Sequence, residues 1–88
     1  MKIKGKYILR KIGNETAAVP VSETVLTSNV LILLNGSGSY LWTLLEKGGT
    51  EDELAASFCE EYDTDIETAK NDIREFTEYL KNNKVEFE

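Results

Sequence analysis

The stretch VLILLNGSGSYLWTLLEKGG, residues 30–49, decides the fold because its apolar pattern changes period in the middle. Val30 to Leu34 is an uninterrupted apolar run of strand length, whose alternate side chains face opposite sides of a sheet. After Asn35 the apolar residues recur at helical spacing, and Gly48 suits the left-handed end of a helix. The stretch predicts a strand that needs cover on both faces and turns directly into a helix.

The turn Gly36-Ser37-Gly38 resembles the start of a phosphate-binding loop. A dinucleotide fingerprint, however, needs a third glycine where this chain has Leu41, and a P-loop needs a lysine followed by a hydroxyl residue. No second parallel strand is predicted after the helix, as a nucleotide-binding unit would require. We therefore predict no nucleotide site and interpret both glycines as residues that let the chain swing tightly from strand to helix.

Upstream of this stretch, Tyr7 to Ile12 and Glu15 to Val21 read as two strands joined by the turn pair Gly13-Asn14. Pro20 lacks a backbone donor, so the second strand must end there or lie at an edge. Downstream, two more helices are expected. Thr50 and Glu53 form a capping box for one, and Asp65 caps the other, which runs to about Asn82.

The apolar stripes of these two helices follow three- and four-residue steps. They comprise Leu54, Ala55, Phe58 and Tyr62 in the first helix, and Ile66, Ala69, Ile73, Phe76 and Leu80 in the second. The predicted fold is α+β, a three-stranded antiparallel sheet followed by three helices, with a winged helix-turn-helix-like order. Trp42 is expected in the core, and Val85 and Phe87 are expected to tack the chain end onto it.

The amino-acid composition limits the classes of function that we expect of this chain. Eighty-eight residues predict a single domain, residues 1–88, with one modest core. The chain has no histidine, the commonest general base and metal ligand, and Cys59 is its only cysteine. We therefore expect no enzyme activity, no cofactor and no metal. The longest apolar run is far too short for a membrane span, and no signal peptide is evident, so a soluble cytoplasmic protein without a membrane partner is expected.

The net charge of −6 is unevenly distributed. The first eleven residues carry five positive charges and no acid, which we interpret as a solvated terminus or as a surface that steers a partner. On the third helix, at about 100° per residue, four side chains fall within about 60° of one another. These residues, Lys70, Arg74, Thr77 and Lys81, form a basic edge on an acidic protein. Two interpretations are open: the bases form local ion pairs along the helix, or they form a docking surface for an acidic peptide.

Residues 34–80 resemble the coenzyme PQQ synthesis protein D family of peptide-recognition domains. The resemblance rests on Leu34-Asn35 before the helix, on Trp42 with Leu44-Leu45, and on the Gly-Thr-x-x-Glu-Leu step from Gly49 to Leu54. It also rests on the spacing of Tyr62, Asp65, Ala69, Asp72, Phe76 and Leu80. The chain departs from the family pattern in its Gly-Ser-Gly after Asn35 and in Asn82-Asn83-Lys84, where a glycine commonly ends the third helix.

The resemblance implies a non-catalytic adaptor without a cofactor, whose fold places a three-stranded sheet on three helices. Such an adaptor binds the leader of a precursor peptide as an added strand and presents it to a modifying enzyme, often a radical S-adenosylmethionine protein. The peptide-binding residues implied here are Val30, Leu31, Ile32, Leu33 and Leu34 on the third strand, and Lys70, Arg74, Thr77 and Lys81 on the third helix.

Two alternatives belong to other classes. A winged helix-turn-helix protein would insert its recognition helix into a DNA groove, yet the third helix with its cap holds five acids and only three bases, so no nucleic-acid partner is expected. A protein-interaction module of another purpose is the second alternative.

Overall fold

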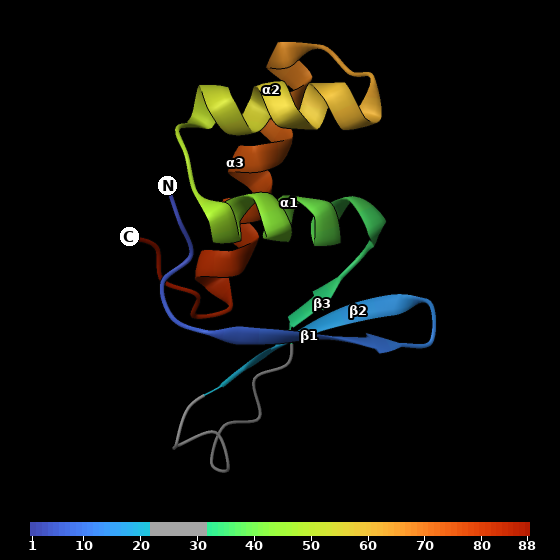
Figure 1. The fold of residues 1–88 in the computed structure, drawn as a ribbon, viewed down its shortest axis with the longest axis vertical. Helices are drawn as coiled ribbons and strands as arrows, with labels where there is room; N and C mark the ends of the chain where they lie inside the picture. Colours follow the sequence, from blue (N-terminus) through green and yellow to red (C-terminus); the bar gives the residue numbers. More distant parts are fainter. Residues whose placement is uncertain (22–31) are drawn as a thin grey trace.

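The structure, a computed structural model, describes residues 1–21 and 32–88. Its elements are β1 (Tyr7–Ile12), β2 (Glu15–Pro20), β3 (Ile32–Leu34), α1 (Gly36–Lys47), α2 (Glu51–Tyr62) and α3 (Ile66–Asn82). The three helices gather on one side of the sheet, and the two chain ends lie close together (Figure 1). This α+β order is the one predicted. Within the two described ranges, no helix combines the length and the apolar character that a membrane crossing requires.

The sheet is antiparallel with β2 in the middle, so β1 and β3 are its edges. β1 and β2 form a hairpin from the pair Tyr7–Pro20 to the pair Ile12–Glu15, and Gly13 takes a positive φ of 63° in the turn. Pro20 is the last residue of β2, as its missing donor predicted, and Val21 lies beyond the strand end.

The structure describes only the later part of the predicted third strand. β3 holds Ile32–Leu34, whereas Val30 and Leu31 lie outside the described residues. Ile32 and Leu34 are buried, but Leu33 between them is 44% exposed. The expectation that both faces are covered is wrong at Leu33, because the helices pack against one face of the sheet only.

The helix ends follow the predicted caps. Thr50 and Glu53 form a complete capping box, and the Asp65 carboxylate accepts a hydrogen bond from the Thr68 N–H at 2.8 Å. Hydrogen bonds from Thr50 lower the pKa of Glu53, and hydrogen bonds from Thr68 lower that of Asp65. Two residues of the predicted apolar stripes, Tyr62 and Ile66, are 42% and 43% exposed, because each lies at a helix end.

Gly36 and Gly38 lie in the first turn of α1 and serve a different purpose from the one predicted. Neither Gly36 nor Gly38 has a positive φ, so neither supplies an unusual backbone conformation. The Asn35 side chain accepts the Gly38 N–H at 2.7 Å and caps α1. A Cβ atom at Gly38 would lie 3.3 Å from the Phe76 ring, while one at Gly36 would meet nothing. Gly38 therefore matters for the close approach of α1 to α3.

The core is built around Trp42, which is fully buried as predicted. The Tyr7 ring meets it edge to face with centroids 4.9 Å apart, and burial raises the pKa of Tyr7. At the chain ends, Ile3 bridges Phe87 and Val85 is buried, so the predicted attachment of the C-terminus is confirmed. The basic N-terminal segment is consequently held by backbone contacts and is not a free tail.

Candidate functional site

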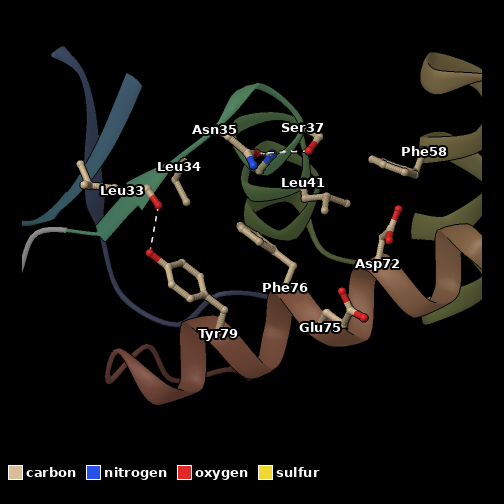
Figure 2. A pocket seen from close by; sticks show the side chains of 11 residues that line it. Leu33, Leu34, Asn35, Ser37, Leu41, Phe58, Asp72, Glu75, Phe76 and Tyr79 are labelled. Atoms are coloured by element: carbon tan, nitrogen blue, oxygen red, sulfur yellow. Dashed lines mark hydrogen bonds between the residues drawn. The ribbon is translucent and has the colours of Figure 1, made fainter. Parts of the chain in front are cut away.

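A groove of about 390 Å³ opens between β3, the start of α1 and one side of α3 (Figure 2). From the strand, the cap of α1 and the first two turns of that helix, it is lined by Leu33, Leu34, Asn35, Ser37, Gly38 and Leu41. From α2 and α3 it is lined by Phe58, Asp72, Glu75, Phe76 and Tyr79. The strand-to-helix turn thus places the sheet edge and α3 on the two walls of one groove.

The floor of the groove is apolar. Leu41 and Phe58 are buried and reach it from α1 and α2, while the half-buried Phe76 enters from α3. Gly38 leaves room for the Phe76 ring, because any larger residue would press on it. An apolar floor beside open backbone groups can take the side chain of an extended peptide.

The charged groups on the α3 wall are acids. Asp72 and Glu75 line the groove, and no lysine or arginine stands among its described lining residues. Neither acid forms a salt bridge within the part of the chain that the structure describes. The groove therefore presents a negative potential to an occupant.

The free edge of β3 faces this groove at Leu33. Leu33 pairs with Ala17 across the sheet, between the pairs Thr16–Leu34 and Ala18–Ile32. Its carbonyl oxygen accepts a hydrogen bond from the Tyr79 hydroxyl at 3.0 Å, as the dashed line in Figure 2 shows. Since that oxygen points away from β2, Leu33 and Ala17 form a non-hydrogen-bonded pair, and the Leu33 N–H points outward as well.

The predicted basic edge lies on the side of α3 that faces α2. Lys70 lies 2.9 Å from the Asp52 carboxylate, and the Arg74 guanidinium donates to both Glu51 oxygens at 3.2 and 2.8 Å. These partners raise the pKa of Lys70 and of Arg74. Both acids belong to α2, so the two bases join α2 to α3.

Thr77 and Lys81 are not free groove residues either. Thr77 is only 7% exposed and donates its hydroxyl to the Arg74 carbonyl at 2.9 Å. The Lys81 ammonium lies 6.0 Å from the centre of the Phe87 ring, at the attached C-terminus. At about 100° per residue, the four predicted residues are centred roughly 180° from the four α3 residues that line the groove. The basic edge therefore lies on the side of α3 away from the groove, and a peptide-binding role for its four residues stays a prediction.

Sequence reasoning assigned no binding role to Asp72, Glu75, Phe76 or Tyr79. Their spacing of three, one and three residues is a helical stripe and was visible in the sequence. Phe76 was placed on the apolar stripe, Asp72 and Phe76 were used for the spacing of the family resemblance, and Glu75 was counted only as charge. What sequence could not supply was the direction in which β3 lies from α3.

The DNA-binding alternative loses support from the same geometry. Of the three bases on α3, Lys70 and Arg74 are engaged with α2 carboxylates, and Asp72 and Glu75 face the open groove. Phosphate binding needs a surface of unpaired cations. Within the described ranges there is also no group of three or more Cys, Asp or Glu side chains that could hold a metal ion.

Comparison with known proteins gives two findings. Residues 14–85 match the family described as coenzyme PQQ synthesis protein D (PqqD). Among solved structures, the chain is similar to "TbiB1 in Complex with the TbiA(beta) Leader Peptide", with a TM-score of 0.74 and 30% sequence identity. The similarity covers 98% of this chain and 95% of that one. No curated protein matches the chain.

Proposed function

We propose that this chain, which belongs to the coenzyme PQQ synthesis protein D (PqqD) family, is an adaptor that binds the leader of a ribosomally made precursor peptide. The observation that carries the proposal is the open groove beside the free edge of β3. The similar TbiB1 structure holds a leader peptide, which supports the same class of ligand here.

The binding mode we propose is strand addition at β3. An edge strand offers unpaired N–H and C=O groups, and an added strand would lie about 4.8 Å from it. The groove runs along this edge, with Leu33 and Leu34 on one wall and Phe76 on the other. Ile32, Leu33 and Leu34 would pair with the leader, and Val30 and Leu31 would extend the same edge in sequence.

We also propose a different peptide chemistry from the one that the sequence suggested. A basic edge at Lys70 and Arg74 suggested an acidic leader, but both bases are engaged with α2. The groove itself offers apolar surface and the carboxylates of Asp72 and Glu75. We propose a leader that places an apolar side chain over Phe76 and neutral or basic side chains toward α3, because acidic ones would be repelled there.

We further propose that the adaptor has no turnover of its own and presents the leader to a peptide-modifying enzyme. The absence of histidine from the whole sequence supports this, since the commonest general base is missing. The family resemblance favours a radical S-adenosylmethionine protein as the partner enzyme.

Calorimetric titration with synthetic peptides tests the proposed function. The ligands are the TbiA(beta) leader and the leader half of a short precursor peptide, which is to be sought among the genes beside this chain's own. The core half of the same precursor is the control. We expect the leader half to bind with a single site and the core half not to bind. Equal binding of both halves, or of neither leader, would contradict leader recognition.

A further inference from the structure

The Tyr79 hydroxyl occupies a backbone acceptor that a strand added at β3 needs, the carbonyl oxygen of Leu33. It donates to the Leu33 carbonyl oxygen at 3.0 Å across the groove. The Tyr79 side chain reaches from α3 to the strand, whereas Phe76, one turn earlier, points into the floor (Figure 2). The hydrogen bond therefore joins the two walls of the groove.

Antiparallel pairing fixes what the incoming strand would do at this position. On the free edge of a short strand, every second residue turns both its N–H and its C=O outward. In the three residues of β3, that residue is Leu33, because Ile32 and Leu34 pair with β2 on either side of it. One residue of the peptide must therefore donate its N–H to the Leu33 oxygen and accept from the Leu33 N–H.

The peptide N–H and the tyrosine hydroxyl compete for the same space. A backbone donor approaches a carbonyl oxygen to about 2.9 Å, which is where the Tyr79 oxygen already lies. The peptide backbone, about 4.8 Å from β3, would also run through the position of the Tyr79 ring end. Strand pairing at Leu33 and the Tyr79 hydrogen bond exclude one another.

We infer that Tyr79 is a cap on the docking edge, a positioning residue that covers the Leu33 carbonyl in the free protein and must swing out when the leader binds. The inference rests on the proposed function. Tyr79 can move at small cost because its side chain is 41% exposed and its hydroxyl has only this hydrogen bond among the described residues. Its ring touches the groove but is not part of the buried core.

The cap has two consequences. It satisfies an edge carbonyl that would otherwise be open to pairing with another chain, which limits self-association at β3. It also sets a threshold for the ligand, because only a peptide that makes further contacts along the groove replaces the hydrogen bond with a net gain. Tyr79 thus weakens the binding of every added strand by the same factor. Selection among peptides then depends on the apolar groove floor and on the carboxylates of Asp72 and Glu75.

The test is the Tyr79→Phe variant, which removes the hydroxyl and keeps the ring. The matched control is Tyr62→Phe, since Tyr62 is 42% exposed, donates weakly to the Gly36 carbonyl at 3.5 Å and does not line the groove. The two leader peptides used above are titrated into the wild type and both variants. Without peptide, the carbonyl carbon shift of Leu33 is recorded by NMR, because it reports on hydrogen bonding to that oxygen.

We expect Tyr79→Phe to bind the leader roughly 2- to 12-fold more tightly, the factor that corresponds to one neutral hydrogen bond, and Tyr62→Phe to bind like the wild type. The Leu33 carbonyl shift should change in free Tyr79→Phe and not in Tyr62→Phe. Unchanged or weaker binding by Tyr79→Phe would overturn the inference while wild-type leader binding still supports the proposed function. If the wild type binds neither leader, the proposed function fails and the inference fails with it.

Discussion

The two long sides of α3 carry opposite charges and have opposite uses. The side toward α2 holds Lys70 and Arg74, each joined to a carboxylate. The side toward β3 holds Asp72 and Glu75, which line an open groove and form no salt bridge with any described residue. A charge seen in a sequence is available for binding only where the neighbouring element leaves it unpaired.

The difference also shows how one helix serves two tasks. Its paired side fixes α2 in place, so that Phe58 of α2 reaches the groove floor. Its open side provides Phe76 and Tyr79 to the wall opposite β3. We therefore expect substitutions on the paired side to affect stability, and substitutions on the open side to affect peptide binding.

The largest expected effect on stability comes from Trp42 in the core, which lies on neither side of α3. Because its side chain is fully buried, Trp42→Ala should lower the free energy of unfolding by about 3–5 kcal/mol, a large fraction of the stability of a small domain. Urea denaturation measures this loss. A variant that melts normally but fails to bind a leader would show that Trp42 is a contact residue and not the common support of both sides.

Phe76→Ala tests the open side. Removing the ring from the groove floor should weaken leader binding about 5-fold or more, since a buried aromatic anchor commonly contributes over 1 kcal/mol to an interface. The control is Leu44→Ala, because Leu44 also packs against the core from partial burial but does not line the groove. Calorimetry measures both affinities. Equal loss of leader affinity in the two variants would indicate a general loss of packing. It would contradict a separate peptide-binding role for the open side of α3.

Arg74→Glu tests the paired side. The new carboxylate would face Glu51, so the melting temperature should fall, while the dissociation constant for the leader should change less than about 2-fold. Adding Glu51→Arg should restore the melting temperature by reversing the pair. A strong loss of affinity for the leader that Glu51→Arg does not restore would show that Arg74 belongs to the peptide-binding surface.

The smallest expected effect is the pH dependence of stability that comes from the helix caps at Glu53 and Asp65. The folded pKa values of Glu53 and Asp65 are lowered by hydrogen bonds, so their contribution to stability is present above the unfolded values of about 4.3 and 3.9. That contribution is lost as pH falls from about 5 through the folded pKa values. Thermal melts across this range measure the loss.

Asp65→Asn serves as the control for the pH effect, because asparagine keeps the cap acceptor and cannot titrate. Its melting temperature should fall less steeply with decreasing pH than that of the wild type. An identical slope would show that Asp65 has no part in the acid sensitivity.

Sequence reasoning succeeded where the signal is local. The capping residues Thr50 and Asp65, the hairpin turn and the burial of Trp42 all follow from spacing and residue type, and the structure confirms them. It failed where the answer depends on contacts distant in sequence. The partners of Lys70 and Arg74 lie 18 and 23 residues away on α2, and sequence periodicity does not specify which helix side α2 covers.

Tyr79 and Gly38 illustrate the same limit. The tyrosine reads as an exposed helix residue, and its role depends on a carbonyl 46 residues earlier in the chain. The glycine reads as a turn residue, but its significance comes from the Phe76 ring that approaches it from α3. Both become functional candidates only when β3, α1 and α3 are placed around one groove.

The proposed function requires a leader to pair with β3 in the groove on the open side of α3. NMR titration of isotope-labelled protein with the leader half of the precursor can show this pairing residue by residue. We predict new protection of the Leu33 amide from exchange, with shifts at Asp72, Glu75, Phe76 and Tyr79, and little change at Lys70 and Arg74. Shifts concentrated on Lys70 and Arg74, or in the segment from Met1 to Lys11, with Leu33 unprotected, would contradict it.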